Sequence, residues 1–273
     1  IGGRLSTKPI GSQIVDYGCQ YIKPKTATSV HLAGKLENLG LLSEINLDAN
    51  KKVFIAPFGM NKIPQYLSRK TKVLSNTFVK TISSKENGWE VYTDAGSFSS
   101  SSVVLTMPIA QVETLLKKSE IENLDLPKVD YLDFHTCTFT SDKQSTEDVF
   151  SKNESFPWIC NNSKKGLRNT ENAFTINVNK DITQMLKDLS TEQKLEIVKG
   201  LLDSSGFENI KGLNVHYWRY AFADNQDNPD YFFNESNGLG VCGDSFSMGK
   251  VDGAIKSAEL LFFQLFNYLN NNY

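Results

Sequence analysis

One stretch decides the fold of this 273-residue chain: Gly238 to Leu265, with the sequence G-L-G-V-C-G-D-S-F-S-M-G-K-V-D-G-A-I-K-S-A-E-L-L-F-F-Q-L. It predicts a short strand ending in an acid, a loop that carries glycine, and a helix whose first turn holds Gly253 and Ala254. From Ala254 to Leu269 the apolar residues recur at the i, i+4, i+7 and i+8 spacing of a helix that packs on one face. We therefore expect this helix to be a core element.

The start of the predicted helix carries no bulky side chain in front of its backbone N–H groups. Such groups are unpaired in the first turn and carry a partial positive charge, which suits an anion or a group that becomes anionic during a reaction. Asp244 follows the strand directly, where its carboxylate can accept hydrogen bonds from hydroxyls. Gly243 lets a ligand approach the backbone closely. The stretch therefore predicts a ligand site.

The same stretch contains a G-x-G-x-x-G spacing at Gly238, Gly240 and Gly243. A dinucleotide fingerprint requires an apolar strand before it and a complete βαβ unit after it, with an acid about 20 residues further on. Here a polar segment precedes the glycines, and one helix follows them. We interpret the spacing as a false positive.

The segment G-D-S-F-S-M-G-K-V-D-G-A-I-K-S-A, beginning at Gly243, resembles the C-terminal flavin-binding segment of the flavin amine oxidase superfamily, and in particular its renalase-like branch. The resemblance implies that Asp244 binds the ribityl or diphosphate part of FAD. It also implies that the helix start faces the pyrimidine end of the isoalloxazine, through Val251, Asp252, Gly253 and Ala254. Ser257-Ala258 stands where the family often has Ser-Gly.

The first residues resemble a second motif of renalase-like proteins, G-G-R-x-x-T followed by D-x-G-A-Q-Y. It is matched by I-G-G-R-L-S-T from Ile1 and by D-Y-G-C-Q-Y from Asp16. The resemblance adds Gly3, Arg4, Gly18 and Gln20 to the expected cofactor contacts. From the pattern alone, Asp16-Tyr17-Gly18 predicts a turn with a polar tip.

In the family, the glycine-rich βαβ unit of about 30 residues lies upstream of that motif. We therefore expect one of two explanations. This chain is a piece of a longer protein, or it is a degenerate relative that cannot hold FAD in the usual way.

The next segments predict helices at Thr26–Leu36 and Leu39–Leu47, and then a strand, a turn and a helix start at Val53–Pro64. The last of these resembles the family's A-P-G-G-M-S-x-L-P, which implies that Met60 passes close to the flavin ring; without the resemblance, Met60 is better interpreted as a core gap-filler. Strands at Phe78–Ser84 and Trp89–Thr93 are joined through Asn87-Gly88, a strong hairpin pattern. Here the resemblance implies that Val79 contacts adenine through its backbone.

The region from about 110 to 213 predicts an α+β substrate domain, with a strand at Tyr131–Ser141 and helices at Asp181–Leu189 and Thr191–Ser205. His135 and Cys137 share one strand face, but no third ligand stands at a metal-binding spacing, so we expect no metal site. The segment from His216 to Ala221 resembles the family's K-W-R-Y-A. Trp218 and Tyr220 could wall the flavin pocket and Arg219 could hold an anionic substrate group, but a packed aromatic strand with a surface Arg explains them equally well.

Composition narrows the class of protein. The formal charge of −2 gives no basic footprint for nucleic acid. No apolar run approaches the roughly 20 residues that span a bilayer. The four cysteines form no C-x-x-C pair, which favours reduced, buried thiols in a cytoplasmic protein.

The predicted fold is α/β: a Rossmann-like FAD-binding domain, incomplete at its N-terminus and carrying a β-meander, plus an α+β substrate domain. The expected boundaries are residues 1–22, 53–109 and 214–273 for the FAD domain, and 23–52 and 110–213 for the substrate domain. No catalytic residue, substrate or oligomeric state follows from the sequence. The resemblance implies an FAD-dependent oxidoreductase that transfers a hydride from a small amine or reduced nicotinamide to flavin N5. The alternative is a fragment or degenerate family member that does not retain FAD and acts as a non-catalytic binding protein.

Overall fold

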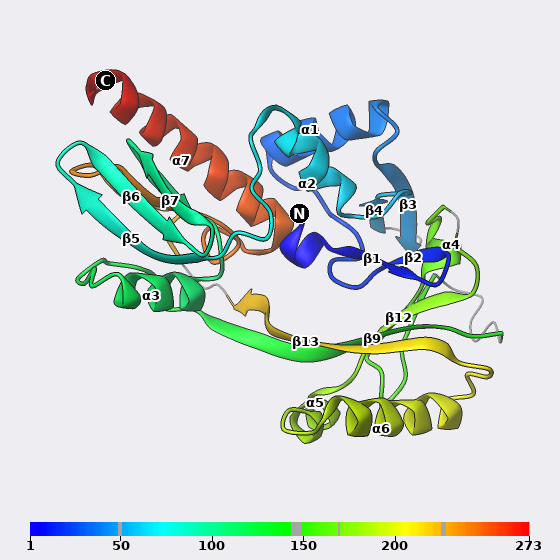
Figure 1. The fold of residues 1–273 in the computed structure, drawn as a ribbon. Helices are drawn as coiled ribbons and strands as arrows, with labels where there is room; N and C mark the ends of the chain where they lie inside the picture. Colours follow the sequence, from blue (N-terminus) through cyan, green and yellow to red (C-terminus); the bar gives the residue numbers. More distant parts are fainter. Residues whose placement is uncertain (49–50, 143–148, 169, 225–227, 273) are drawn as a thin grey trace. The chain divides into compact units, whose positions relative to one another are not determined.

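The computed structural model describes residues 1–48, 51–142, 149–168, 170–224 and 228–272 as a mixed α/β protein (Figure 1). The chain divides into two compact units. Unit 1 comprises Ile1–Pro24, Val30–Lys72 and Asp133–Ala221, and unit 2 comprises Lys25–Ser29, Val73–Leu132 and Phe222–Tyr273. The predicted α/β class is confirmed.

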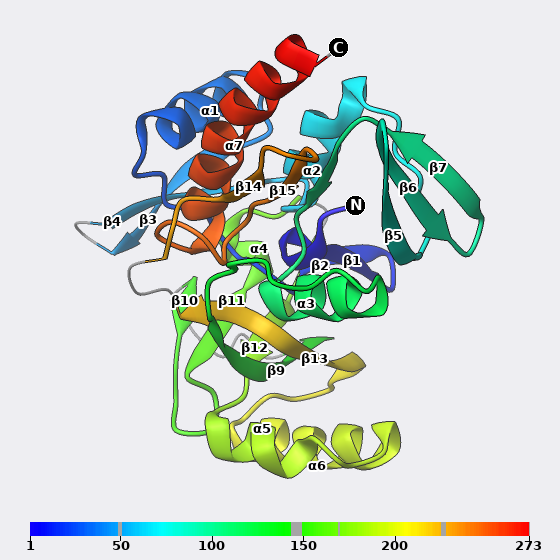
Figure 2. The same ribbon diagram turned by 90° about the vertical axis from the view of Figure 1, so that its left-hand side faces the viewer.

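Unit 1 is built on a five-stranded sheet of order β10-β11-β12-β9-β13. Helices α5 and α6 lie along one face of this sheet (Figures 1 and 2), where Phe139, Phe174 and Phe207 form the aromatic centre of the core. The elements are β9 (Asp130–Thr140), β10 (Phe150–Ser151), β11 (Trp158–Asn161), α4 (Asn162–Lys165), β12 (Ala173–Asn177), α5 (Lys180–Leu186), α6 (Thr191–Ser204) and β13 (Lys211–Asp224).

The N-terminal part of unit 1 begins with a 3-10 turn, η1 (Gly3–Leu5), and a hairpin of β1 (Thr7–Ile10) and β2 (Gln13–Asp16). The hairpin packs against β12 of the sheet: the Thr175 hydroxyl donates to the Asp16 carbonyl oxygen at 2.7 Å. Next come α1 (Ala27–Asn38), whose first residues belong to unit 2, then the paired strands β3 (Ser43–Asp48) and β4 (Lys51–Ile55), and finally α2 (Lys62–Leu67) and η2 (Ser68–Lys70).

The helix predicted at Leu39–Leu47 is wrong, because the chain forms β3 there. Ser43, Ile45 and Leu47 are partly buried, whereas Glu44 and Asn46 between them are exposed. That alternation of period two is the pattern of a strand.

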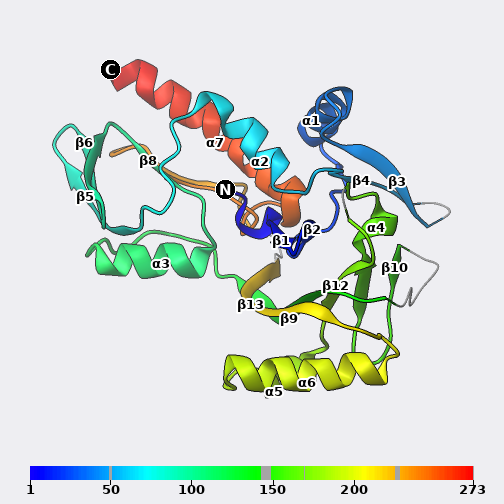
Figure 3. The ribbon, with the colours of Figure 1, turned by 45° about the vertical axis from the view of Figure 1, so that its right-hand side comes forward.

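Unit 2 contains the predicted meander, β5 (Val79–Lys85), β6 (Gly88–Thr93) and β7 (Gly96–Ser100), and a second sheet of order β14-β15-β8 (Figure 3). In that sheet β8 (Val103–Leu105) runs parallel to β15 (Leu239–Val241), and β14 (Phe232–Asn234) pairs antiparallel with β15. Helix α3 (Ile109–Lys118) has four buried apolar residues in the core of this unit. Helix α7 (Lys250–Asn272) contacts β14 and β15.

Helix α7 lies very close to β15, which explains two of the glycines in the false G-x-G-x-x-G. A Cβ on Gly240 would lie 3.0 Å from Leu261, and one on Gly238 would lie 2.6 Å from the Tyr268 ring. The expectation that α7 buries one continuous apolar face is only partly met. Leu261 is buried, but Phe262 and Phe266 are more than half exposed, because they project from the side of the helix that the described residues of unit 2 do not cover.

The compact units differ from the expected domains. Residues 1–22 were assigned to the FAD domain together with 214–273, yet they pack in unit 1 with residues 133–221. The reason is physical: the β1–β2 hairpin hydrogen-bonds to β12, and a buried ion pair joins β2 to α4. The expected domain boundaries, and the function assigned to each domain, stay predictions.

Candidate functional site

The carboxyl ends of β8 and β15 lead into the cofactor-binding segment that is predicted in unit 2. These strands are parallel, and the Cys242 N–H continues the ladder by donating to the Leu105 carbonyl at 3.1 Å. The chain then turns at Gly243, whose φ of 145° is a conformation that side-chain-bearing residues rarely adopt. Its N–H donates to the Ser257 hydroxyl at 3.1 Å, so helix α7 fixes the turn. A Cβ at Gly243 would meet only the Thr106 carbonyl oxygen, at 3.6 Å, and the space beside the turn is otherwise open within unit 2.

The loop from Gly243 to Gly249 folds back on itself before α7 begins. Phe246 is fully buried, its N–H bonds to the Gly243 carbonyl, and the Gly249 N–H bonds to the Phe246 carbonyl. The Gly253 N–H is taken up by the Gly249 carbonyl at 2.8 Å. The N–H groups of Val251 and Asp252 stand earlier in the first turn, where a helix provides no acceptor of its own. They are the donors that α7 can offer to a ligand.

Two of the predicted cofactor residues at the start of α7, Asp252 and Gly253, are buried. A Cβ on Gly253 would lie 3.1 Å from the Met248 backbone, so the close approach of the preceding loop explains the glycine at this position. The Asp252 carboxylate accepts from the Lys25 N–H at 3.0 Å and from the Thr26 N–H at 3.4 Å, and so caps the residues that lead into α1. The Gly253 N–H is bonded to Gly249, so of these two residues only Asp252 has a backbone N–H that the first turn of the helix leaves without an acceptor. Val251 and Ala254 are partly buried.

Two opposing effects determine the pKa of the Asp252 carboxyl. Burial alone would raise its pKa, but hydrogen bonds from the Ser29 hydroxyl and from the Lys25 and Thr26 N–H groups outweigh burial and hold the pKa below its usual value. The second oxygen, Oδ2, is buried and has no hydrogen-bond partner among the described residues. Asp244, at the start of the same loop, is partly buried and is not without an interaction partner.

The predicted contacts that lie in the first residues of unit 1 surround the N-terminal turn. A Cβ on Gly18 would lie 2.1 Å from the Arg4 carbonyl oxygen, so only glycine fits there. That carbonyl accepts from the Cys19 N–H at 2.7 Å, and the Arg4 guanidinium donates to the Tyr220 carbonyl at 2.9 Å. Gly3 has a φ of 52° and open space around it. Gly3 and Arg4, in η1, thus lie beside Gly18, which follows β2.

Asp16 and Lys165 form an ion pair of 2.8 Å in which neither side chain has any exposed surface. The acid of the turn predicted at Asp16-Tyr17-Gly18 is therefore buried, and a lysine from α4 compensates its charge. Lys165 also donates to the Gln20 side-chain oxygen at 3.0 Å. The Gln20 amide nitrogen in turn donates to the Asp16 and Gly18 carbonyls, at 2.6 and 3.0 Å, so its side chain is occupied inside the protein.

Met60 and Val79 lie in different units and are placed differently. The Met60 side chain is fully buried, and its N–H donates to the Asp16 carboxylate at 2.8 Å. This burial fits the gap-filling interpretation of the side chain. Val79 is partly buried at the start of β5, the edge strand of the meander, packed against the core of unit 2.

The segment predicted to line a substrate pocket is divided between the two faces of β13. Because neighbouring residues of a strand alternate, Arg219 projects from the opposite face to Trp218 and Tyr220, and Arg219 is exposed. Trp218 stacks on Tyr17 at 5.3 Å between ring centroids, and its ring N–H donates to the Tyr17 carbonyl. His216 packs edge-on against both rings. The structure therefore separates Arg219 from the aromatic group that it was expected to join.

Sequence reasoning missed that Tyr17 lies beside Trp218 and that Lys8 lies beside Tyr17. The Lys8 ammonium lies 4.8 Å from the Tyr17 ring centroid, and burial lowers its pKa to about 8. The alternation of β1 and β2 could have placed Lys8 and Tyr17 on the same face. It could not have placed Trp218 beside them, because Trp218 is 201 residues from Tyr17 in the sequence.

His135 and Cys137 lie on the face of β9 that α5 and α6 cover. Within the described part of the chain, no group of three or more His, Cys, Asp or Glu side chains is arranged to hold a metal ion. The four cysteines are free thiols, and Cys137, Cys160 and Cys242 are buried. None of the described helices is long and apolar enough to cross a membrane.

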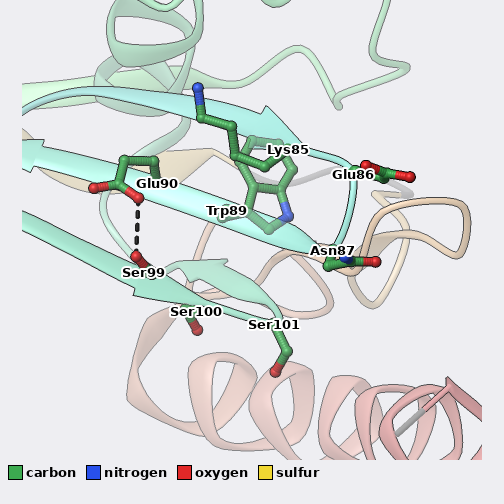
Figure 4. A pocket seen from close by; sticks show the side chains of 8 residues that line it. All are labelled: Lys85, Glu86, Asn87, Trp89, Glu90, Ser99, Ser100 and Ser101. Carbon is green, nitrogen blue, oxygen red and sulfur yellow. Dashed lines mark hydrogen bonds between the residues drawn. The ribbon is translucent and has the colours of Figure 1, made fainter.

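A hollow of about 520 Å³ lies on the meander of unit 2, where Glu90 accepts a hydrogen bond from Ser99 (Figure 4). Its walls are Lys85, Glu86, Asn87, Trp89, Glu90, Ser99, Ser100 and Ser101. None of the residues predicted to bind the cofactor lines it. We therefore do not place the predicted cofactor site in this hollow.

Comparison with known proteins identifies related sequences and folds. The model of a family described as flavin-containing amine oxidoreductase matches residues 45–260. No curated protein matches the sequence. Among solved structures, the chain resembles one from Exiguobacterium sp. 255-15 that bears the name putative protoporphyrinogen oxidase, with a TM-score of 0.60 and 13% sequence identity. The likeness covers 81% of this chain and 54% of that one, so this chain spans about half the length of the protein it resembles. At this identity the likeness concerns the fold alone.

Proposed function

The chain belongs to the family of flavin-containing amine oxidoreductases, and from this premise we propose that it is a renalase-like, FAD-dependent oxidoreductase. Its proposed reaction is the transfer of a hydride from a small amine or a reduced pyridine-type substrate to N5 of the flavin. The family match over residues 45–260 is the observation that carries the proposal. The renalase-like branch rests on the motifs at Gly3, Met60, Trp218 and Asp244.

The residues present fit a flavin. Gly243 leaves open space beside a backbone turn, and the first turn of α7 has N–H groups at Val251 and Asp252 for which a helix provides no acceptor of its own. One oxygen of Asp252 is buried without a partner among the described residues. These features suit a ligand that is polar and rich in hydrogen-bonding groups.

The flavin, when bound, would supply the acceptance of the hydride. The chain's own residues would bind and orient. The N–H groups of Val251 and Asp252 would stabilise negative charge, since the start of a helix carries a partial positive charge. The Asp244 carboxylate would accept hydrogen bonds from hydroxyls of the cofactor. The Tyr17–Trp218 pair would offer a flat apolar wall to a substrate.

The test of this function uses the full-length protein. We expect it to be purified with bound FAD, and the flavin absorbance to bleach without oxygen when a reduced nicotinamide or a small amine is added. A full-length protein that is colourless and cannot be reconstituted with FAD would favour the alternative, a non-catalytic binding protein. Bound FAD that no amine or reduced nicotinamide bleaches would contradict the proposed substrate class.

A matched pair of variants sharpens the test. Asp244→Ala should lower the ratio of flavin to protein, because cofactor hydroxyls would lose their acceptor. Asp230→Ala in the same unit removes a carboxylate that pairs with Lys256 at 2.8 Å, and it should leave the ratio unchanged. Equal flavin content in both variants would remove Asp244 from the site.

A further inference from the structure

The buried ion pair of Asp16 and Lys165 is the centre of a hydrogen-bond network inside unit 1. Asp16 Oδ2 accepts from the Lys165 ammonium at 2.8 Å, and Asp16 Oδ1 accepts from the Thr7 hydroxyl at 2.5 Å and from the Met60 N–H at 2.8 Å. Thr7 also accepts from the Asn61 N–H at 3.2 Å. A single carboxylate therefore joins β1, the end of β2, α4 and the turn before α2.

The other arm of the network orients Gln20. An ammonium can only donate, so Lys165 selects the oxygen of the Gln20 amide, at 3.0 Å. The amide nitrogen must then face the carbonyls of Asp16 and Gly18, to which it donates. These bonds close the turn from Tyr17 to Gln20, whose Gly18 lies against the Arg4 carbonyl.

Stability alone is a weak reason for this arrangement. A buried ion pair loses the hydration of both charges, and its replacement by well-packed apolar residues is often neutral or stabilising. Removing one partner is costly, because it leaves an unpaired buried charge. The pair does fix geometry: it has one arrangement that satisfies both charges, and that arrangement sets the relative positions of two turns.

We propose that Asp16 and Lys165 are positioning residues for the predicted flavin-binding residues of unit 1. They lock two turns into one geometry. One is the turn from Tyr17 to Gln20, which lies against Arg4, and the other is the turn before α2, which carries Met60. Four of the predicted cofactor residues are attached to these turns: Arg4, Gly18, Gln20 and Met60. The inference rests on the proposed function, since the turns matter only if the protein holds FAD.

The test compares two ion pairs of unit 1 in the full-length protein. Lys165→Met removes the buried ammonium and releases Gln20. Lys187→Met removes the ammonium that pairs with Asp133 at 2.6 Å, where the side chains are 30% and 22% exposed and no predicted cofactor residue is attached. We expect Lys165→Met to weaken FAD binding by about tenfold or more and to change the absorbance spectrum and midpoint potential of the flavin that remains. Lys187→Met should leave all three unchanged.

A double variant, Asp16→Asn with Lys165→Met, keeps the inference testable if the single variant does not fold. The amide introduced by Asp16→Asn retains an oxygen for the Thr7 and Met60 donors and leaves no unpaired charge. The double variant should restore thermal stability but not the spectrum and potential, because Gln20 stays released. Wild-type affinity, spectrum and potential in a folded Lys165 variant would overturn the inference. A wild-type protein without any affinity for FAD would instead overturn the proposed function, and the inference with it.

Discussion

His135 is a buried residue whose surroundings oppose a charge. Its ring stacks on Tyr217 at 4.8 Å, and neither ring nitrogen has a hydrogen-bond partner among the described residues. Burial lowers its pKa to about 4, and the positive charges of Lys194, Lys187 and His216 act in the same direction, against the Asp133 carboxylate. His135 is thus a residue of strand β9 whose ring nitrogens the described residues leave without hydrogen bonds.

This environment predicts a stability that depends on pH. In the unfolded chain the pKa of histidine is about 6.5, so between about pH 6.5 and pH 4 the unfolded state binds the proton that the folded state refuses. The free energy of unfolding should therefore fall as the pH drops through this window. His135→Phe should remove that part of the loss, measured by urea unfolding at several pH values. His31→Gln, at an exposed position of α1, is the control and should keep the wild-type slope; an unchanged slope in His135→Phe would contradict the prediction.

The fate of Asp16 shows what sequence reasoning misses at this scale. The pattern Asp-Tyr-Gly placed a turn correctly, since β2 ends at Asp16. It did not predict that the Asp16 charge is neutralised by a lysine 149 residues later in the sequence. Local periodicity carries no information on such a partner. The alternation of β13 did carry the information that separates Arg219 from Trp218.

Secondary structure followed local patterns closely wherever the period was clear. The predicted helices near α1, α5 and α6, the Asn87-Gly88 hairpin and its two strands are confirmed. The helix predicted at Leu39–Leu47 failed because the apolar residues of this short segment match either period. Leu36 and Leu42 are buried, and the strand pairing of β3 with β4 decides the outcome.

Replacement by alanine is predicted to have opposite effects on stability at two glycines, Gly240 of β15 and Gly200 of α6. Gly240→Ala would place a Cβ 3.0 Å from Leu261, where the packed helix cannot easily move, and should destabilise the protein by roughly 1–3 kcal/mol. Gly200 lies inside α6 with nothing within 4 Å of an added Cβ. Gly200→Ala should stabilise by up to about 1 kcal/mol, since alanine is the better helix former. Thermal and urea unfolding measure both; a neutral Gly240→Ala would mean that α7 packs more loosely on β15.

At the scale of the molecule, each unit has its own buried core. The core of unit 1 is centred on Phe139, Phe174 and Phe207, and that of unit 2 on Trp89, Leu105 and Phe246. The sequence predicted an α/β chain with a discontinuous arrangement and grouped residues 1–22 with residues 214–273, whereas residues 1–22 pack in unit 1. Their place in unit 1 is decided by hydrogen bonds to β12 and α4 rather than by their own composition.

The cysteines offer a way to observe the two units separately. Cys19, Cys137 and Cys160 belong to unit 1 and Cys242 to unit 2. Burial raises the pKa of Cys19 and Cys242 to about 11 and that of Cys137 and Cys160 to about 12, so thiolate is scarce at pH 8. Native thiols should therefore react with iodoacetamide about a hundredfold more slowly than unfolded ones. Pulse labelling across a urea gradient, with mass spectrometry of each peptide, should give one midpoint for the three thiols of unit 1 and a different midpoint for Cys242. Because each unit has its own core, a single shared midpoint would show that the two unfold as one cooperative structure.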